Sequence, residues 1–261
     1  MEKKPQPNLK YQKLIRAAYW ISASIIFFVI LGAAVLDNST RPCTAVRISI
    51  NHESGLFFLD ENDVAEMISA FYQTSLTETP VRHIPLKELE QKLEANPYVE
   101  NAEVYTDNKG ALHVFVEQAK PLVRIVNTKG VSYYLDVKGK KIPLSPKFTA
   151  RVVVATGNLQ EDDKEQMKRL LDLCRFISED KFWQSQFEQI NITGSGDYDL
   201  VPKLGNYLIR LGKPEMLEEK FWKMEIFYKE VLKNVDSKDF RIVNLEFKDQ
   251  IVCTKKNNGN V

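Results

Sequence analysis

The chain has 261 residues, a formal net charge of +1 and 27% charged residues. A balanced charge without a long basic run after residue 37 argues against a nucleic-acid-binding protein. The cysteines, Cys43, Cys174 and Cys253, are too few for a disulfide-built scaffold, although a bridge between Cys174 and Cys253 stays possible in an oxidising compartment. The length after residue 37 suits two modest domains better than one.

Residues 17–36 form a stretch without any charged side chain. As a helix it would span roughly 30 Å, the thickness of the hydrocarbon core of a bilayer. We therefore predict one membrane-spanning helix, represented by Ala17, Trp20, Ile25, Phe28, Leu31 and Leu36. The basic residues that precede it predict a cytoplasmic N-terminus. A cleaved secretory signal is the alternative, but the apolar run is longer than the usual ~7–15 residues and no strong cleavage site follows it.

The segments around this helix have different expected roles. Residues 1–16 are polar and basic with two prolines, which predicts a short disordered cytoplasmic tail. Residues 37–42 are expected to be a linker, and everything after them is expected outside the cytoplasm.

A first domain is predicted over residues 43–120. Apolar residues alternate at Val46, Ile48 and Ile50, as in a strand with one buried face. Two helices are expected next, one after Asp60 and one near Pro85. Two strands, over 99–104 and 112–116, flank a turn at 107–110. The order of elements is β-α-α-β-β.

A second domain is predicted over residues 121–254, and residues 255–261 are expected to be a frayed tail. Its expected elements are a hairpin over 131–142, a buried strand at 152–155, a helix opened by the acidic residues 161–163, short strands at 187–193, 198–202 and 207–211, a helix over 215–233, and final strands at 240–247 and 250–254. The fold class is α+β, with a second domain rich in antiparallel strands.

No catalytic, cofactor-binding or metal-binding motif stands out. His52, His83 and His113 have no metal-ligand spacing and no partnered titratable group in a known pattern. The glycine-rich segment 194–197 lies between two predicted strands, which favours a turn over a phosphate-binding loop or a calcium site. We therefore expect a protein that acts by contact, with no cofactor and no small-molecule substrate.

Several segments together resemble a known family. Asn96-Pro97-Tyr98-Val99 is followed by Ala102-Glu103-Val104, by the strand 112–117 and by Pro121, and later by Leu211-Gly212 before the last long helix. This combination is similar to the FtsQ/DivIB family of bacterial division proteins, in which a POTRA domain follows a single membrane anchor. The resemblance implies a non-catalytic scaffold in the plasma membrane at the division septum, with single-pass partners of the FtsB/DivIC and FtsL types.

The resemblance also implies where partners bind. The family docks its partner near a short "D-x-R-Y" pattern at the C-terminal strands, and the matching segment here gives the candidate partner-binding residues Asn244, Leu245, Glu246, Phe247, Ile251 and Val252. Glu246 replaces the arginine of the family, so any ion pair at this position calls for a basic partner. A closed hairpin that its own domain buries is the alternative for this segment.

Two other functions are open to a chain of this kind. A POTRA-type factor could assist the export or assembly of outer-membrane polypeptides, but only one POTRA-like unit is visible. A membrane-anchored hydrolase of the cell wall is disfavoured because the search for catalytic motifs is empty.

Overall fold

The computed structural model describes residues 9–40, 42–52, 55–72 and 79–256. The chain divides into two compact units. The first unit comprises Met1–Ile50, Glu61–Leu93 and Ala102–Val116, and the second comprises Asn51–Asp60, Glu94–Asn101 and Glu117–Val261. Each unit is described by itself.

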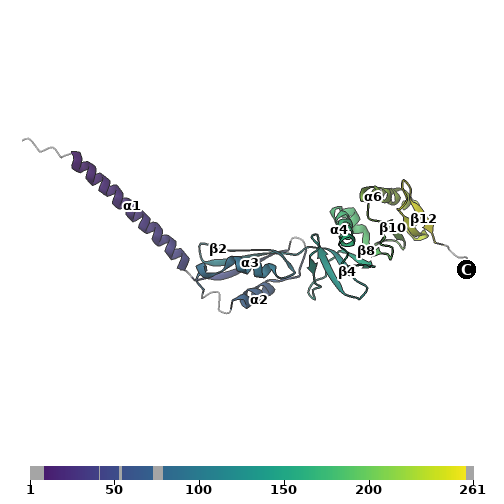
Figure 1. Cartoon of the computed structure of the whole chain (residues 1–261), viewed down its shortest axis with the longest axis horizontal. Coiled ribbons are helices and arrows are strands. Elements are labelled where there is room, and N and C mark those ends of the chain that lie inside the picture. The colour runs from purple at the N-terminus through teal and green to yellow at the C-terminus, as the bar shows by residue number, and fades with distance from the viewer. Residues whose placement is uncertain (1–8, 41, 53–54, 73–78, 257–261) are drawn as a thin grey trace, which may run out of the picture. The chain divides into compact units, whose positions relative to one another are not determined.

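The described chain begins with one long helix, α1, over Leu9–Thr40 (Figure 1). This helix includes residues 9–16 and 37–40, where a disordered tail and a linker were expected. No proline occurs between Pro7 and Pro42, so every residue of the helix keeps the N–H donor that helical hydrogen bonds need. Residues 1–8 of the predicted tail and Arg41 of the predicted linker lie outside the described residues.

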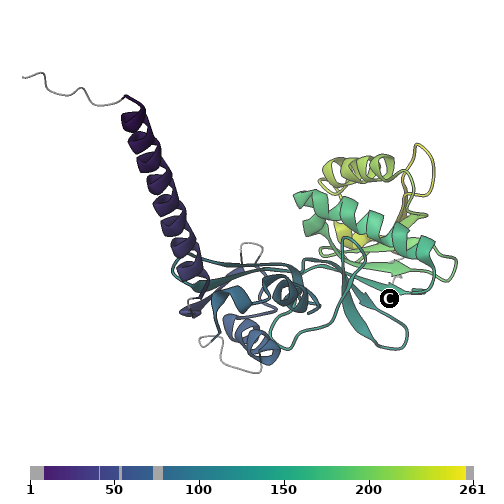
Figure 2. The same ribbon diagram turned by 60° about the vertical axis from the view of Figure 1, so that its left-hand side comes forward.

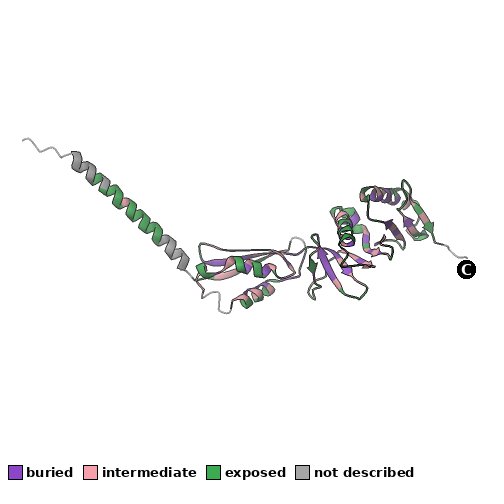
Figure 3. Ribbon diagram, in the orientation of Figure 1, coloured by how far each residue is buried: buried purple, intermediate pink, exposed green. Residues whose placement is uncertain are grey.

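The side chains that the structure describes in α1 are almost all exposed (Figure 3). Among the predicted membrane-spanning residues, Trp20, Ile25, Phe28 and Leu31 are exposed, and Ala17 and Leu36 have no described side chains. Within the residues described, no helix combines the length and the apolar character that a membrane crossing requires. The crossing at 17–36 stays a prediction.

The first unit contains the predicted β-α-α-β-β order, which is confirmed. Its elements are β1 (Ala45–Asn51), α2 (Glu61–Phe71), the 3-10 turn η2 (Val81–His83), α3 (Leu86–Glu94), β2 (Val99–Thr106) and β3 (Ala111–Gln118). The sheet has the order β1-β3-β2. The predicted turn between β2 and β3 forms because the Asp107 carboxylate accepts the N–H groups of Lys109 (2.8 Å) and Ala111 (2.9 Å).

The second unit is built on a nine-stranded sheet of order β12-β11-β10-β9-β8-β7-β4-β5-β6. These strands are β4 (Pro121–Val126), β5 (Ser132–Asp136), β6 (Lys141–Ile142), β7 (Val153–Gly157), β8 (Phe187–Ile192), β9 (Tyr198–Pro202), β10 (Leu208–Gly212), β11 (Phe240–Asn244) and β12 (Val252–Lys255). The pairs β4/β7, β7/β8 and β10/β11 are parallel, and the other neighbours are antiparallel.

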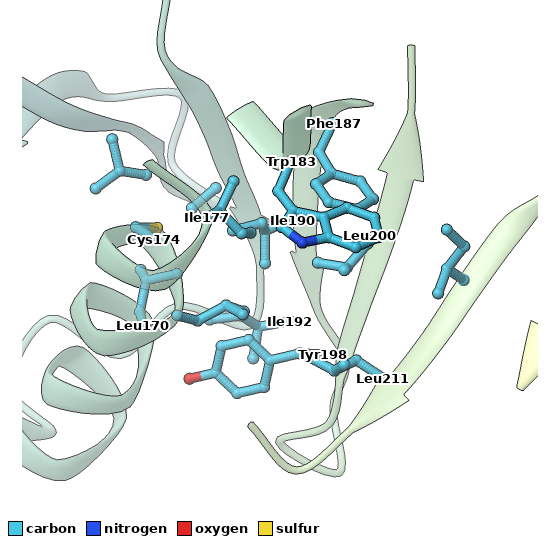
Figure 4. Packing of buried hydrophobic residues seen from close by; sticks show 14 of the residues in the cluster. Leu170, Cys174, Ile177, Trp183, Phe187, Ile190, Ile192, Tyr198, Leu200 and Leu211 are labelled. Atoms are coloured by element: carbon cyan, nitrogen blue, oxygen red, sulfur yellow. The ribbon is translucent and has the colours of Figure 1, made fainter. Parts of the chain in front are cut away.

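Helices pack on this sheet and close its core. They are α4 (Lys164–Glu179), α5 (Lys181–Gln186) and α6 (Leu217–Ile226), which continues as a π-helical turn over Phe227–Val231; a short 3-10 turn, η4, covers Ser237–Asp239. Both views place α4 and α6 beside the strands of this unit (Figures 1 and 2). Figure 4 shows Leu170 and Cys174 of α4 facing Ile192 and Leu200 of the strands, with Trp183 of α5 between them, and all five are buried.

Three features of the second unit differ from the expectation. Strand β4 was not predicted, because Leu122 and Val123 are both buried and the run lacks a clean two-residue alternation. Helix α5, six residues long, is too short to show a helical period. The predicted strand 240–247 ends at Asn244, whose side-chain oxygen accepts the Glu246 N–H (2.8 Å) and so turns the chain out of the strand.

Strand β12 ends at Lys255, a residue that was expected in the frayed tail. Residues 257–261 lie outside the described residues. Cys43, Cys174 and Cys253 are all free thiols, so the possible Cys174–Cys253 bridge does not form.

Candidate protein-docking site

The six candidate partner-binding residues gather in one hairpin. Asn244 ends β11 and pairs with Val252, the first residue of β12. Leu245, Glu246 and Phe247 lie in the connection between the two strands, and Ile251 lies immediately before β12. The structure therefore places the candidate residues together, although four of them, Leu245, Glu246, Phe247 and Ile251, lie outside the strands in which they were expected.

Strand β12 is the last strand at its edge of the sheet and pairs only with β11 among the described residues. The Lys256 N–H donates to the Asp239 carbonyl (2.8 Å), on the side of β11. Successive residues of a strand turn their N–H groups to opposite sides, so we infer that the N–H groups of Cys253 and Lys255 point to the free edge. This edge can accept a further strand through its backbone.

The side chains of the hairpin divide into buried and exposed ones. Leu245 is fully buried in the core of the second unit, so it supports the fold and is not available to a partner. Phe247 is 45% exposed and Val252 is 39% exposed. Asn244 and Ile251 are half-buried. The alternative interpretation, a closed hairpin buried by its own domain, therefore holds for Leu245 but not for Phe247 and Val252.

Glu246 is held against the end of β10. Its carboxylate accepts a hydrogen bond from the Asn244 amide (2.9 Å), and its N–H donates to the Asn244 side-chain oxygen (2.8 Å). A Cβ atom at Gly212 would lie 2.7 Å from Cγ of Glu246, and Gly212 has a φ of +71°. Only glycine combines this backbone conformation with the space that Glu246 occupies.

Two buried lysines, Lys220 and Lys223 of α6, support this region and were missed by sequence reasoning. The Lys220 Nζ donates to the carbonyls of Leu211 (2.8 Å) and Lys213 (2.6 Å) at the end of β10. The Lys223 Nζ donates to the Phe247 carbonyl (2.8 Å) and, more weakly, to that of Leu245 (3.4 Å).

A signal for these lysines was present in the sequence. Lys220 and Lys223 fall among Leu217, Phe221 and Met224, on the face that the helical period assigns to the core. Burial lowers the pKa of Lys220, and the neighbouring Lys223 charge acts in the same direction. Buried ammonium groups need acceptors, and here the backbone carbonyls supply them.

The other residues considered for chemistry take structural roles. The His52 ring lies 3.0 Å from the Leu56 carbonyl, and His113 lies 3.1 Å from the Asp107 carboxylate. The predicted turn at 194–197 is confirmed by the hydrogen bonds between Thr193 and Asp197. Across the residues with described placement, no three His, Cys, Asp or Glu side chains gather as a metal site.

Comparison with known proteins gives two matches along the chain. A family model described as "FtsQ/DivIB, C-terminal related" matches residues 120–254, which is more than half of the 261 residues. A second model, described as a POTRA-like domain, matches residues 41–117. No curated protein matches the chain.

Proposed function

Since the chain belongs to the FtsQ/DivIB C-terminal-related family, we propose that it is a non-catalytic scaffold of the bacterial cell-division machinery. It acts by recruiting and positioning other division proteins. The observation that carries this proposal is the free edge of β12, which lies within the matched region and offers backbone donors beside two exposed apolar side chains, Phe247 and Val252.

Residues 17–36 are proposed to anchor the protein in the plasma membrane, with the N-terminus in the cytoplasm and the chain after residue 37 outside it. Support comes from the uncharged sequence, from the basic residues before it, and from the exposed apolar side chains of α1. Anchoring in the same membrane raises the effective concentration of the docking site for other anchored proteins. The septum is the proposed location.

The partners are proposed to be single-pass proteins of the FtsB/DivIC and FtsL types. A partner segment adds as a strand to β12, and its affinity comes largely from backbone hydrogen bonds. Glu246 offers a carboxylate in the connection between β11 and β12, on the side of β10, so a basic residue of the partner is expected to reach that connection. The domain boundaries at 43–120 and 121–254 are proposed to separate a POTRA-like module from the module that carries this edge.

The experiment compares partner capture by three forms of the full-length protein, purified from its native membrane. Cys253→Pro removes an N–H group that we infer to face outward, and proline is tolerated at sheet edges. Cys253→Ser keeps that N–H and is the matched control. We expect the serine form to retain its single-pass partners and the proline form to lose most of them, with unchanged circular dichroism.

Equal capture by the proline and serine forms would place docking elsewhere on the molecule. If the wild-type protein brought down no membrane protein of the division machinery, the scaffold function itself would lose its support. The two results are distinct because the first compares variants and the second concerns the wild type alone.

A further inference from the structure

Helix α6 has a second surface that the proposed docking hairpin does not use. On its outer face Trp222 is 60% exposed and Ile226 is 38% exposed. Residues four apart lie one above the other on a helix, so the two side chains form a continuous apolar stripe. A single exposed apolar residue is ordinary, but an exposed tryptophan beside an isoleucine offers the kind of anchor that protein interfaces use.

Carboxylates surround this stripe on both sides. Glu218 and Glu219 lie four and three residues before Trp222, and Glu225 lies three residues after it, so all three share its side of the helix. We name Trp222, Ile226 and these three glutamates the Trp222 patch. Glu218 makes no ion pair with any residue that the structure describes.

The patch is acidic because two lysines of α6 point their side chains away from it and into the unit. Lys220 and Lys223 are only 7% and 5% exposed, because both point inward to backbone carbonyls. Both ammonium groups are therefore bound inside the unit and do not balance the charge of the outer face. Lys223 also lies 3.4 Å from Glu219. Lys229, three residues after Ile226, is exposed on the same side of the helix and is paired with Glu225. Among the described residues around Trp222, this leaves Glu218 as the unpaired charge, beside the carboxylates of Glu219 and Glu225.

These charges argue against two of the possible occupants. An anionic lipid surface would be repelled by the glutamates, even though tryptophan favours membrane interfaces. A second copy docking through the same patch would set Glu218 and Glu219 of both chains against each other. A partner that carries positive charge around an apolar stripe would be attracted by the glutamates instead of repelled.

We propose that the Trp222 patch docks a basic amphipathic helix of a protein partner. Apolar side chains of that helix pack on Trp222 and Ile226, and its Lys or Arg side chains lie beside Glu218 and over the indole ring. This inference rests on the proposed scaffold function and adds a second docking surface, with its own partner chemistry, to the β12 edge.

The patch is physically connected to the proposed docking hairpin. Lys223 comes directly after Trp222 in α6, and its Nζ holds the carbonyl of Phe247 at 2.8 Å. The helix and the hairpin connection are thus held together within one unit. One partner that carries a strand and a basic helix can engage both surfaces, and the second contact then gains from the effective concentration set by the first.

The test is photocrosslinking in the native membrane with the full-length protein. A benzophenone amino acid replaces Trp222, and the crosslinked peptide is identified by mass spectrometry. The matched control places the same group at Leu204, which is 80% exposed and follows a lysine instead of glutamates. A second form adds Glu218→Lys to the crosslinker at 222. Capture of the single-pass partners is measured in the same preparations.

The expected result is a crosslink from position 222 to a peptide rich in Lys or Arg with helical apolar spacing, absent from position 204. Glu218→Lys should reduce its yield at least about tenfold, because it sets like charges against each other. A crosslink to lipid, to a second copy, to an acidic peptide, or no crosslink at all would overturn the proposal. If partners are still captured in that case, only the Trp222 patch fails, whereas loss of all partners in the wild type would contradict the scaffold function.

Discussion

The two edges of the nine-stranded sheet are built in opposite ways. At one edge β6 has only two residues, Ile142 is fully buried, and Lys141 is paired with Glu161 (2.6 Å). At the other edge β12 has four residues, and its strand residues are exposed or half-buried. Short strands and charged pairs are the devices by which proteins protect sheet edges from further pairing. One edge is therefore closed, and the other is left open to a partner.

The largest effect on stability is expected at the closed edge. Ile142→Ala removes a fully buried side chain from a cluster with Tyr134 and Phe58, which should cost about 2–5 kcal/mol of unfolding free energy. The matched change at the open edge, Val252→Ala, should cost less than about 1 kcal/mol because Val252 is already 39% exposed. Urea unfolding of the full-length protein in micelles, followed by the fluorescence of Trp183 and Trp222, measures both.

Similar losses from the two substitutions would contradict this contrast, since they would mean that β12 is packed as firmly as β6. A control at the closed edge uses a smaller change. Ile142→Val should lie between wild type and Ile142→Ala, at about 0.5–1.5 kcal/mol.

A smaller effect is expected where α6 supports the open edge. Lys223→Met removes the donor from the Leu245 and Phe247 carbonyls, which should cost about 1–3 kcal/mol and loosen the hairpin connection. Hydrogen exchange of residues 245–249 should become faster. Lys229→Met is the matched control, because Lys229 is an exposed lysine paired on the surface with Glu225. Equal exchange in the two variants would show that Lys223 does not hold the connection.

The smallest effect concerns the ion pair of the closed edge. The hydrogen bond from Lys141, and to a smaller extent the one from Asn127, lowers the pKa of Glu161 to about 2 in the folded protein. In an unfolded chain the pKa of a glutamate is about 4.3. The stabilisation is therefore fully present above pH 4.3 and is lost as the pH falls toward 2. The difference in thermal midpoint between wild type and Glu161→Gln should be small at pH 7 and should vanish near pH 2. A difference that grows on acidification would contradict this assignment.

Much of this architecture could be predicted because the spacing of apolar residues and the residues that form turns are local signals in the sequence. The strands around the turn at 107–110 follow from alternation, and the helix after the acidic residues 161–163 follows from the favourable position of acidic residues at a helix start. The structure adds that the Asp163 carboxylate accepts the N–H groups of Glu165 and Gln166. These features need no knowledge of the rest of the fold. The family resemblance of residues 120–254 was also recognised from short motifs and is confirmed.

The features that escaped prediction depend on contacts that are distant in the sequence. Strand β4 is defined by its pairing with β5 and β7. Which edge stays open follows from strand order, which no local pattern encodes. The inward direction of Lys220 and Lys223, and hence the acidic surroundings of Trp222, depends on carbonyls at the ends of β10 and β11.

The most direct test of the open edge is amide hydrogen exchange over residues 250–256 in the full-length protein, with and without its co-purified partners. Strand addition predicts that the amides of Cys253 and Lys255 exchange at least about tenfold more slowly in the complex, because free N–H groups at an edge become donors in a new ladder. Residues 141–142 at the closed edge should not change. Unaltered exchange over 250–256 in a complex that retains its partners would contradict docking at β12.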